Sequence, residues 1–402
     1  MSPSFLSNAD PKAAKHLRDI LRLCTTNDTL SIAEIAKELE LSVPTVTKFI
    51  MQLIDEGFLT GSGKADTSGG RKPMTYCLNP DAGYFVGVDV ARRHFHISVT
   101  DFKGKSICFI QDIEFVLEAN ADSFKNISYI IKEEVIKAGI PWDRVIGAGI
   151  SLSGRVNPEE GYSLSFFINE RIPLKSLFQN ELGIPVCIEN DSRAMTYGEY
   201  LSSEEVRRKE KNMLFINISW GLGMGMIAGG RLYYGKSGYS GEIGHFPLMD
   251  NGKICRCGKI GCLETGASGS ALRDIIEEQL SKGRKSVLSS KVHEGGYIDL
   301  EEIMAAIDNG DMLAIEGIGE VGSTLGRAIA GLMNIFNPGL VVIGGRLIVA
   351  GDYLMLPVRT AVNKYSMNKI SAETAIRFSC LGRSAASIGA CLIARDSLLG
   401  LI

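Results

Sequence analysis

The chain lacks the features that mark membrane-spanning, exported and polycationic proteins. It contains no run of about 18 consecutive apolar residues, so we expect no membrane span. The sequence does not open with a basic segment followed by an apolar stretch, so we expect no export signal and a cytoplasmic location. Lys and Arg (43) are slightly outnumbered by Asp and Glu (46). Any binding of nucleic acid must therefore come from a local surface.

The composition also excludes a disordered or fibrous chain. Hydrophobic residues make up 45% and charged residues 22% of the 402 residues, which is ordinary for globular proteins. A chain of this length has room for roughly two to three domains of about 150 residues each. We therefore expect several hydrophobic cores.

The cysteines argue against a disulfide framework. There are nine, an odd number, and Cys255, Cys257 and Cys262 lie close together in the sequence. With His245 they supply three thiolates and one imidazole, which is a closed tetrahedral ligand set for a structural Zn²⁺ ion. The alternative is that these cysteines are free and buried, and that the histidine is there by chance.

Residues 1–80 have the pattern of a small helical domain with a wing. Apolar residues recur at three- and four-residue steps in successive segments, and Ser31 with Glu34 forms a capping box. The second and third of these helices are joined by a tight turn, which predicts a helix-turn-helix. The predicted helices cover 14–24, 31–39 and 42–57, and the predicted wing strands cover 58–60 and 74–78.

This domain is expected to bind DNA, although its charges are balanced. The side chains left on the outer face of the third helix are candidates for base-edge contacts: Thr45, Thr47, Lys48 and Gln52. Arg71 and Lys72 lie beside glycines and are suited to phosphates or to a minor groove. The alternative is a helical bundle that binds another protein or caps the remainder of the chain.

The remaining residues alternate between strand and helix patterns, which predicts an α/β fold with a mixed sheet. The cycle of strands begins at Tyr84 and starts again at Met213, which indicates two similar lobes. The boundaries that we expect are a winged helix-turn-helix in 1–80, a small α/β lobe in 81–190 with the C-terminal helix 381–402, and a large lobe in 191–380 that carries the zinc site.

The cysteine segment also carries a family resemblance. The stretch Glu242-Ile243-Gly244-His245 through Cys255-x-Cys257-Gly258-x-x-Gly261-Cys262-x-Glu264 closely resembles the signature of the ROK family (repressors, open reading frames, kinases). The N-terminal domain resembles that of the family's repressor branch, which responds to sugars. The resemblance covers essentially the whole chain. It implies an actin-like, hexokinase-type ATPase fold after residue 80, with a sugar held between the lobes.

The resemblance also implies a sugar site. The residues that match the family's sugar-binding positions are Gly154, Arg155, Asn190, Asp191, Glu242, His245 and Glu264. Carboxylates, amides and imidazoles are the paired acceptors and donors that sugar hydroxyls need, and a zinc ion would orient the His245 ring. Asp191 could instead cap a helix after the strand 186–188, and Glu264 could be a surface helix residue.

Two departures from the family's kinases argue against phosphoryl transfer. Asp191 matches their catalytic base and would here be a vestige of it. Their first phosphate loop reads Asp-x-Gly-x-Thr, whereas this chain has Asp89-Val90-Ala91-Arg92-Arg93. In the second loop, 221–225, Leu222 replaces a threonine. We therefore expect neither ATP nor Mg²⁺ to be a cofactor.

Together these features predict a sugar-responsive regulator of transcription, most consistent with a repressor of carbohydrate-utilisation genes. Its partners would be operator DNA, a sugar or sugar phosphate, and a second copy of the chain in a homodimer or homotetramer. One alternative is an ATP-dependent hexose or N-acetylhexosamine kinase with an added DNA-binding domain. Another is a partner-binding regulator that uses the wing and the C-terminal helix 384–399.

Overall fold

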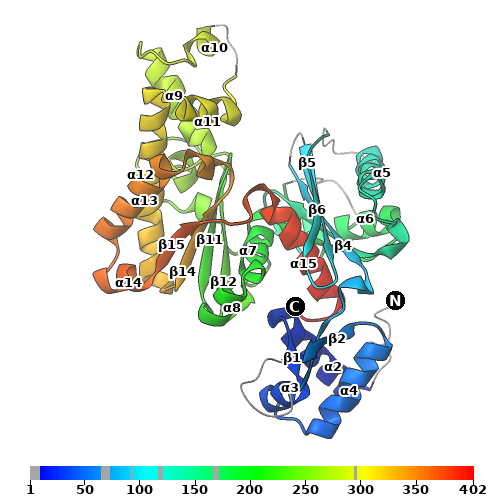
Figure 1. Cartoon of the computed structure of the whole chain (residues 1–402). Coiled ribbons are helices and arrows are strands. Elements are labelled where there is room, and N and C mark those ends of the chain that lie inside the picture. The colour runs from blue at the N-terminus through cyan, green and yellow to red at the C-terminus, as the bar shows by residue number, and fades with distance from the viewer. Residues whose placement is uncertain (1–9, 65–72, 92–93, 116–120, 166–171, 294–296) are drawn as a thin grey trace. The chain divides into compact units, whose positions relative to one another are not determined.

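The computed structural model describes residues 10–64, 73–91, 94–115, 121–165, 172–293 and 297–402 (Figure 1). Contacts within the chain separate two compact units. The first comprises Met1–Arg208 and Ser384–Ile402, and the second comprises Lys209–Arg383. Among the described residues, no helix is both long and apolar enough to cross a membrane.

The N-terminal part of the first unit is a winged helix-turn-helix. Its helices are α2 (Pro11–Thr26), α3 (Ile32–Glu38) and α4 (Val43–Asp55), and its strands are β1 (Leu30–Ser31), β2 (Leu59–Lys64) and β3 (Met74–Leu78), in the order β1-β3-β2. Ser31 and Glu34 form the predicted capping box, and Ser42 accepts a hydrogen bond from the Thr45 N–H. Strand β1 was not predicted, because its two residues form a strand only by pairing with β3.

The α/β part of the first unit is built on a mixed five-stranded sheet in the order β10-β7-β4-β5-β6. Strands β4, β5 and β6 pair antiparallel, and β7 and β10 are added parallel to β4. The sheet strands are β4 (Tyr84–Val90), β5 (His94–Asp101), β6 (Ser106–Glu114), β7 (Val145–Leu152) and β10 (Val186–Asn190), and the short pair β8 (Val156–Asn157) and β9 (Tyr162–Ser163) follows β7.

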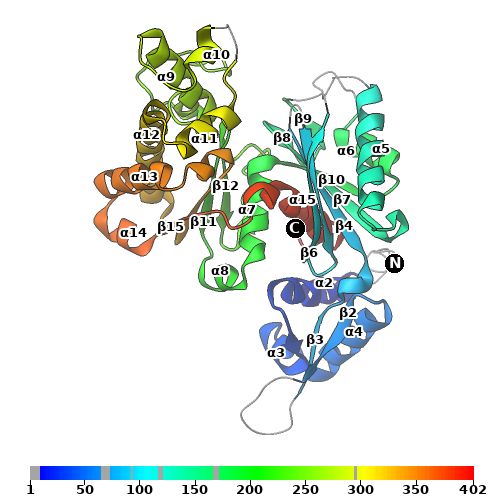
Figure 2. The same ribbon diagram turned by 45° about the horizontal axis from the view of Figure 1, so that its top comes forward.

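Helices cover both faces of this sheet. Helices α5 (Ala121–Lys137) and α6 (Leu174–Leu182) pack on one face, where Phe124 and Phe178 meet. Helix α15 (Ala385–Leu398) packs against the other (Figure 2). The approach of α15 is close, since a Cβ on Gly87 would lie 1.9 Å from the Ser387 carbonyl oxygen. Glycine is therefore required where this helix crosses β4.

Helix α7 (Asp191–Ser202) also packs against α15, and α8 (Glu204–Lys209) follows it. At their crossing a Cβ on Gly389 would lie 1.8 Å from the Ala194 carbonyl oxygen, and the Tyr197 hydroxyl donates to Asp396 at 2.5 Å. These contacts place α7 in the first unit, whereas the predicted lobe boundary at residue 190 assigned it to the second. The boundary between the units lies at Arg208 because α7 is packed by residues distant in the sequence.

One hydrophobic cluster joins the winged helix to the rest of the first unit. It includes Leu17 and Leu21 of α2 together with Leu399 and Leu401, which follow α15. Phe102 extends the cluster, and its ring centroid lies 5.5 Å from that of Phe58 and 5.9 Å from that of Phe85. The winged helix-turn-helix and the residues that follow α15 therefore share one core.

The second unit repeats the connectivity of the first sheet. Its five strands run in the order β13-β12-β11-β14-β15, with β11, β12 and β13 antiparallel and with β14 and β15 parallel to β11. This repeat matches the predicted two similar halves. The strands are β11 (Met213–Ile218), β12 (Leu222–Ala228), β13 (Arg231–Leu232), β14 (Leu340–Gly344) and β15 (Ala375–Phe378).

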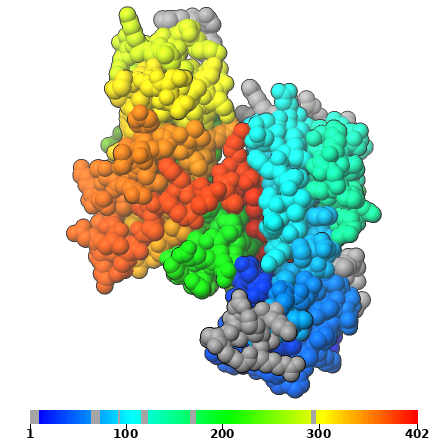
Figure 3. Space-filling model, in the orientation of Figure 1, coloured from blue at the N-terminus to red at the C-terminus, as the bar shows by residue number. Residues whose placement is uncertain are grey.

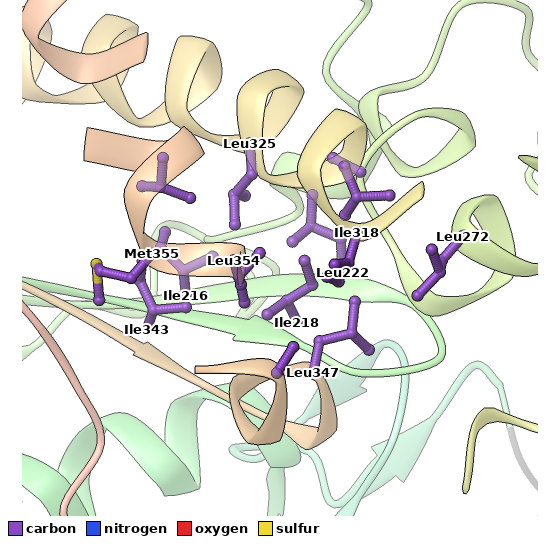
Figure 4. Packing of buried hydrophobic residues seen from close by; sticks show 14 of the residues in the cluster. Ile216, Ile218, Leu222, Leu272, Ile318, Leu325, Ile343, Leu347, Leu354 and Met355 are labelled. Carbon is purple, nitrogen blue, oxygen red and sulfur yellow. The ribbon is translucent and has the colours of Figure 1, made fainter. Parts of the chain in front are cut away.

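The core of the second unit lies between this sheet and its helices. The helices are α9 (Gly269–Ser281), α10 (Ser289–His293), α11 (Leu300–Asp308), α12 (Met312–Phe336), α13 (Asp352–Tyr365) and α14 (Asn368–Glu373). Figure 4 shows Ile216, Ile218 and Ile343 of the strands facing Ile318 and Leu325 of α12. All five side chains are fully buried.

Candidate functional site

The structure brings the four predicted metal ligands together in the second unit. The ligand atoms of His245, Cys255, Cys257 and Cys262 all lie within 4.8 Å of one another. The Cys255 Sγ lies 3.7 Å from the His245 Nδ1, and the Cys257 Sγ lies 3.6 Å from the Cys262 Sγ. A tetrahedral ion with sulfur bonds of about 2.3 Å separates its sulfur ligands by ~3.8 Å. The cluster therefore fits a bound metal ion in donor type and in spacing.

The chemistry of the thiols also fits a cation. All nine cysteines are free, which excludes disulfides in this cluster. Burial raises the pKa of the Cys262 thiol to about 12, and burial also raises the pKa of Cys255. The pKa of Cys257 is lowered, chiefly because its sulfur accepts a hydrogen bond from the Lys259 N–H. Buried thiols of this kind are protonated on their own, and a bound metal ion deprotonates them.

The expected sugar residues of the second unit surround this cluster. Glu242 Oε2 lies 3.8 Å from the His245 Nε2, on the opposite side of the ring from the cysteines. Glu264 accepts a hydrogen bond from the Leu222 N–H at 3.1 Å, and its other oxygen lies 3.6 Å from Arg256. The Glu264 side chain is only 12% exposed, so it is not a surface helix residue. Gly244 is needed here because a Cβ would lie 2.5 Å from the Leu222 carbonyl oxygen.

The expected sugar residues of the first unit converge where β10 leads into α7. Asn190 is the N-cap of α7, since its Oδ1 accepts from the Arg193 N–H, and Asp191 is the first helical residue. This corrects the alternative in which Asp191 caps the helix. The Asn190 Nδ2 donates to the Gly154 carbonyl oxygen at 2.8 Å and to the Asp191 carboxylate at 2.9 Å. Gly154, at φ +87°, and Arg155 are both exposed at this edge.

Asp191 is held as an oriented acceptor. Ser153 donates its hydroxyl to the Asp191 Oδ2 at 2.9 Å, and the Ser192 N–H donates to the Oδ1 at 2.7 Å. Burial raises the pKa of the Asp191 carboxyl, and these hydrogen bonds oppose that rise. Ser153 was missed as a site residue, because a serine beside a glycine in a loop carries no distinctive signal.

A second group of potential ligands lies on β5 and β6 and does not present a metal site. The ligand atoms of His94, His96 and Asp112 lie within 4.8 Å of one another. However, the His96 Nδ1 accepts a hydrogen bond from the Asp112 N–H at 3.0 Å. A neutral imidazole that accepts at one nitrogen carries its proton on the other, so no lone pair is left for an ion.

The predicted DNA contacts lie on α4. Lys48 is exposed, and Thr45, Thr47 and Gln52 are half-buried. The Thr45 hydroxyl lies 2.7 Å from the Ser42 hydroxyl, and Thr47 donates to the Val43 carbonyl oxygen at 2.8 Å. The hydroxyl oxygens of Thr45 and Thr47 can still accept hydrogen bonds from the bases. Arg71 and Lys72 lie outside the described residues.

Two apolar residues of α4 were missed as contact candidates. Val43 is 52% exposed and Met51 is 45% exposed. The core stripe of this helix runs through Val46, Phe49 and Leu53, so Val43 and Met51 do not belong to it. The offset of Met51 was readable from the sequence, whereas Val43 lies three and seven residues before Val46 and Ile50 and so falls on the stripe by spacing alone. Exposed apolar side chains on such a helix suit the methyl group of thymine.

Comparison with known proteins identifies the family. A model of the ROK family matches residues 85–397, and a model of the MarR family matches residues 18–62. The chain belongs to the ROK family. The fold that the resemblance implied is also confirmed, with a winged helix-turn-helix before an actin-like, hexokinase-type domain.

Similar proteins in this family include both regulators and kinases. The chain is 29% identical to the xylose repressor of Bacillus subtilis strain 168 over 389 residues, which is 96% of this chain and 95% of the repressor. It superposes with a TM-score of 0.79 and 29% identity on a ROK family transcriptional regulator, a homolog of the E. coli MLC protein, covering 96% of this chain and 98% of that one. A ROK glucokinase from Streptomyces griseus, solved with glucose and AMPPNP, gives a TM-score of 0.65 and 26% identity over 78% of this chain and 100% of the glucokinase.

The two segments that correspond to the phosphate loops of ROK kinases are altered. After Asp89, the Ala91 N–H donates to the His94 carbonyl oxygen. Arg92 and Arg93 lie outside the described residues. In the second segment the Leu222 side chain is buried in the hydrophobic core (Figure 4), and its N–H is already bonded to Glu264. Of the described residues in these two segments, Leu222 offers ATP phosphates neither a hydroxyl group nor an N–H that is not already bonded.

Proposed function

We propose that this protein is a sugar-responsive, DNA-binding regulator of transcription, and specifically a repressor of carbohydrate-utilisation genes. The observation that carries the proposal is the single hydrophobic cluster shared by the helix-turn-helix core and the residues that follow α15. Helix α15 packs against α7, and α7 begins at Asn190 and Asp191, two of the proposed sugar ligands. A structural change at the sugar site can thus be transmitted through the contacts of α7 and α15 to the helix-turn-helix.

The proposed sugar ligands have the chemistry of a hydroxyl-binding site. In the first unit, Asn190 and Asp191 offer an amide and a fixed carboxylate, beside Gly154 and Arg155. In the second unit, Glu242, His245 and Glu264 offer two carboxylates and a ring N–H. Such groups accept from and donate to sugar hydroxyls without requiring any covalent step.

The metal ion is proposed to be structural Zn²⁺, held by His245, Cys255, Cys257 and Cys262. Three sulfurs and one nitrogen complete a tetrahedral shell, so the ion would have no open position for a substrate or water. When bound, it would supply positive charge that keeps the thiols ionised. The His245 Nδ1 faces the sulfurs, which leaves the Nε2 to carry the proton and to donate toward Glu242 or a sugar hydroxyl.

Operator DNA and a second copy of the chain complete the proposal. The α4 side chains that would contact base edges are Thr45, Thr47, Lys48 and Gln52. The contacts to the DNA backbone or to a minor groove would come from Arg71 and Lys72.

A homodimer or homotetramer would match a palindromic operator. Exposed apolar side chains on α13, including Tyr353 and Leu356, support self-association, and Figure 3 shows this helix (orange) at the surface. Binding to genomic DNA would place the protein in the cytoplasm.

A thermal-shift screen of the metal-loaded protein tests the sugar part of this proposal. A ligand that binds only the folded state stabilises it by about 2.7 kcal/mol when present at 100 times its Kd. We expect a shift with one free or phosphorylated sugar and none with ATP and Mg²⁺. If no sugar shifts the melting temperature, the proposal that a sugar is the effector is contradicted, although the proposal of DNA binding is not.

A sugar kinase is the second candidate function. The similarity to a glucokinase and the match of Asp191 to the kinase base favour it, whereas the altered phosphate loops oppose it. A coupled assay of ADP release, run with free hexoses and N-acetylhexosamines, separates the two. Turnover with any sugar would establish the kinase, and we expect none.

A further inference from the structure

A fully buried ion pair lies directly behind the proposed sugar ligands of the first unit. Arg193 on α7 and Glu189 on β10 are each only 1% exposed. The Arg193 Nη2 and Nε lie 2.6 Å and 2.7 Å from the same Glu189 oxygen, Oε1. The sugar-site residues predicted from the sequence do not include this pair.

Burial makes this pair expensive unless its remaining hydrogen-bonding groups are satisfied. The partners described here belong to the edge of the sugar site. The Arg193 Nη2 also donates to the Val156 carbonyl oxygen at 3.0 Å, and the Asn190 N–H donates to the Glu189 Oε1 at 2.6 Å. Val156 begins β8, a strand labelled in Figure 2, and follows Gly154 and Arg155 directly in the sequence.

The pair therefore adds a connection between two segments that the sugar ligands already connect. The Asn190 amide donates to the Gly154 carbonyl oxygen, and Ser153 donates to the Asp191 carboxylate. Arg193 donates to the carbonyl oxygen of Val156, two residues beyond Gly154 on the same loop. Together these contacts fix the loop against the start of α7.

We infer that Arg193 is a positioning residue of the sugar site. It fixes the Gly154–Val156 loop and, through Glu189, the backbone of Asn190, so that the loop and the Asn190–Asp191 ligands present one rigid surface to the sugar. The inference rests on the proposed function. A planar guanidinium suits this task because it donates to two acceptors in fixed directions, whereas an ammonium group is a flexible point charge.

The substitution Arg193→Lys tests this role because it keeps the buried charge. A lysine can pair with Glu189 or reach the Val156 carbonyl oxygen, but it cannot reproduce the forked contact with both. The matched control is Val135→Ala on α5, which removes buried volume in the core of the same sheet and changes none of the hydrogen-bonding groups of Arg193 or Glu189. Sugar affinity is measured by calorimetry at room temperature, and stability by thermal melting, with D-xylose, D-glucose and N-acetyl-D-glucosamine as probes.

We expect Arg193→Lys to weaken the binding of the recognised sugar about tenfold or more, which corresponds to the loss of one hydrogen bond to a charged group. Val135→Ala should lower the melting temperature and leave the affinity unchanged. Equal sugar affinity in Arg193→Lys and the wild type would overturn the inference and leave the proposed function intact. Failure of the wild type to bind any of the probes would overturn the inference together with the sugar-responsive part of the proposed function, although not the DNA binding.

A second variant decides the matter if Arg193→Lys does not fold. In the double variant Glu189→Gln with Arg193→Met, both buried charges are removed together, so no unpaired charge is left inside. The amide oxygen introduced at position 189 can still accept from the Asn190 N–H, but the hold on Val156 is lost. A folded double variant with weakened sugar binding supports the positioning role, and one with wild-type affinity refutes it.

Discussion

The shared core between the winged helix and the end of the chain makes one prediction that can be worked out in magnitude. Leu399 is fully buried in the cluster that includes Leu17 and Leu21 of α2. Truncating a buried leucine to alanine costs about 2–5 kcal/mol, depending on how far the site collapses. For a unit of this size, 1 kcal/mol shifts the melting temperature by roughly 2–4 °C. Leu399→Ala should therefore lower the melting temperature of the first unit by roughly 4–20 °C.

Ile402 provides the matched control because it lies three residues further along and is 53% exposed. Ile402→Ala should change stability by less than about 0.5 kcal/mol. Melting is followed by calorimetry, and operator binding by fluorescence anisotropy with and without sugar. We expect Leu399→Ala, and not Ile402→Ala, to reduce the effect of sugar on operator affinity. If Leu399→Ala melts and responds to sugar like Ile402→Ala, the shared core does not link the two functions.

Three further predictions concern individual residues. Cys262→Ser should abolish metal binding, which is measured as zinc content per chain. It should also weaken sugar binding, because the metal no longer orients the His245 ring. Unchanged sugar affinity in a variant without metal would refute that coupling. Lys48→Ala should weaken operator binding about tenfold in anisotropy titrations if it contacts a base edge, and unchanged binding would exclude it. Ser153→Ala removes a hydrogen bond that lowers the pKa of the Asp191 carboxyl, so this pKa should rise in the variant. Because sugar binding needs the ionised carboxylate, the sugar affinity of the variant should fall at a higher pH on acidification than that of the wild type. An unshifted pH profile of sugar affinity would show that Asp191 does not bind the sugar as a carboxylate.

The features that depend on local sequence were predictable. The caps at Ser31 and Ser42 bond to backbone groups three residues away, so they and their helices follow from the sequence alone. The metal ligands lie in or near one short loop, and their spacing was sufficient to bring them together. The repeated strand pattern likewise predicted the two similar sheets.

The features that depend on distant packing were not predictable. Helix α7 belongs to the first unit because α15, from the far end of the chain, packs against it. Arg193 reads as an ordinary charged helix residue, and only the tertiary fold buries it between Glu189 and Val156. Ser153 likewise bonds to Asp191 only because the strand before it ends beside that residue. A single sequence contains no local signal for such contacts.

The most direct test of the central claim is operator affinity measured with and without the sugar found by thermal shift, on a duplex selected from genomic DNA by the protein itself. A coupling free energy of about 1–3 kcal/mol corresponds to a change in DNA affinity of roughly 5–150-fold. We predict tight binding to the selected duplex and a loss of affinity within that range when the sugar is added. Equal affinity with and without a sugar that demonstrably binds would contradict a sugar-responsive regulator.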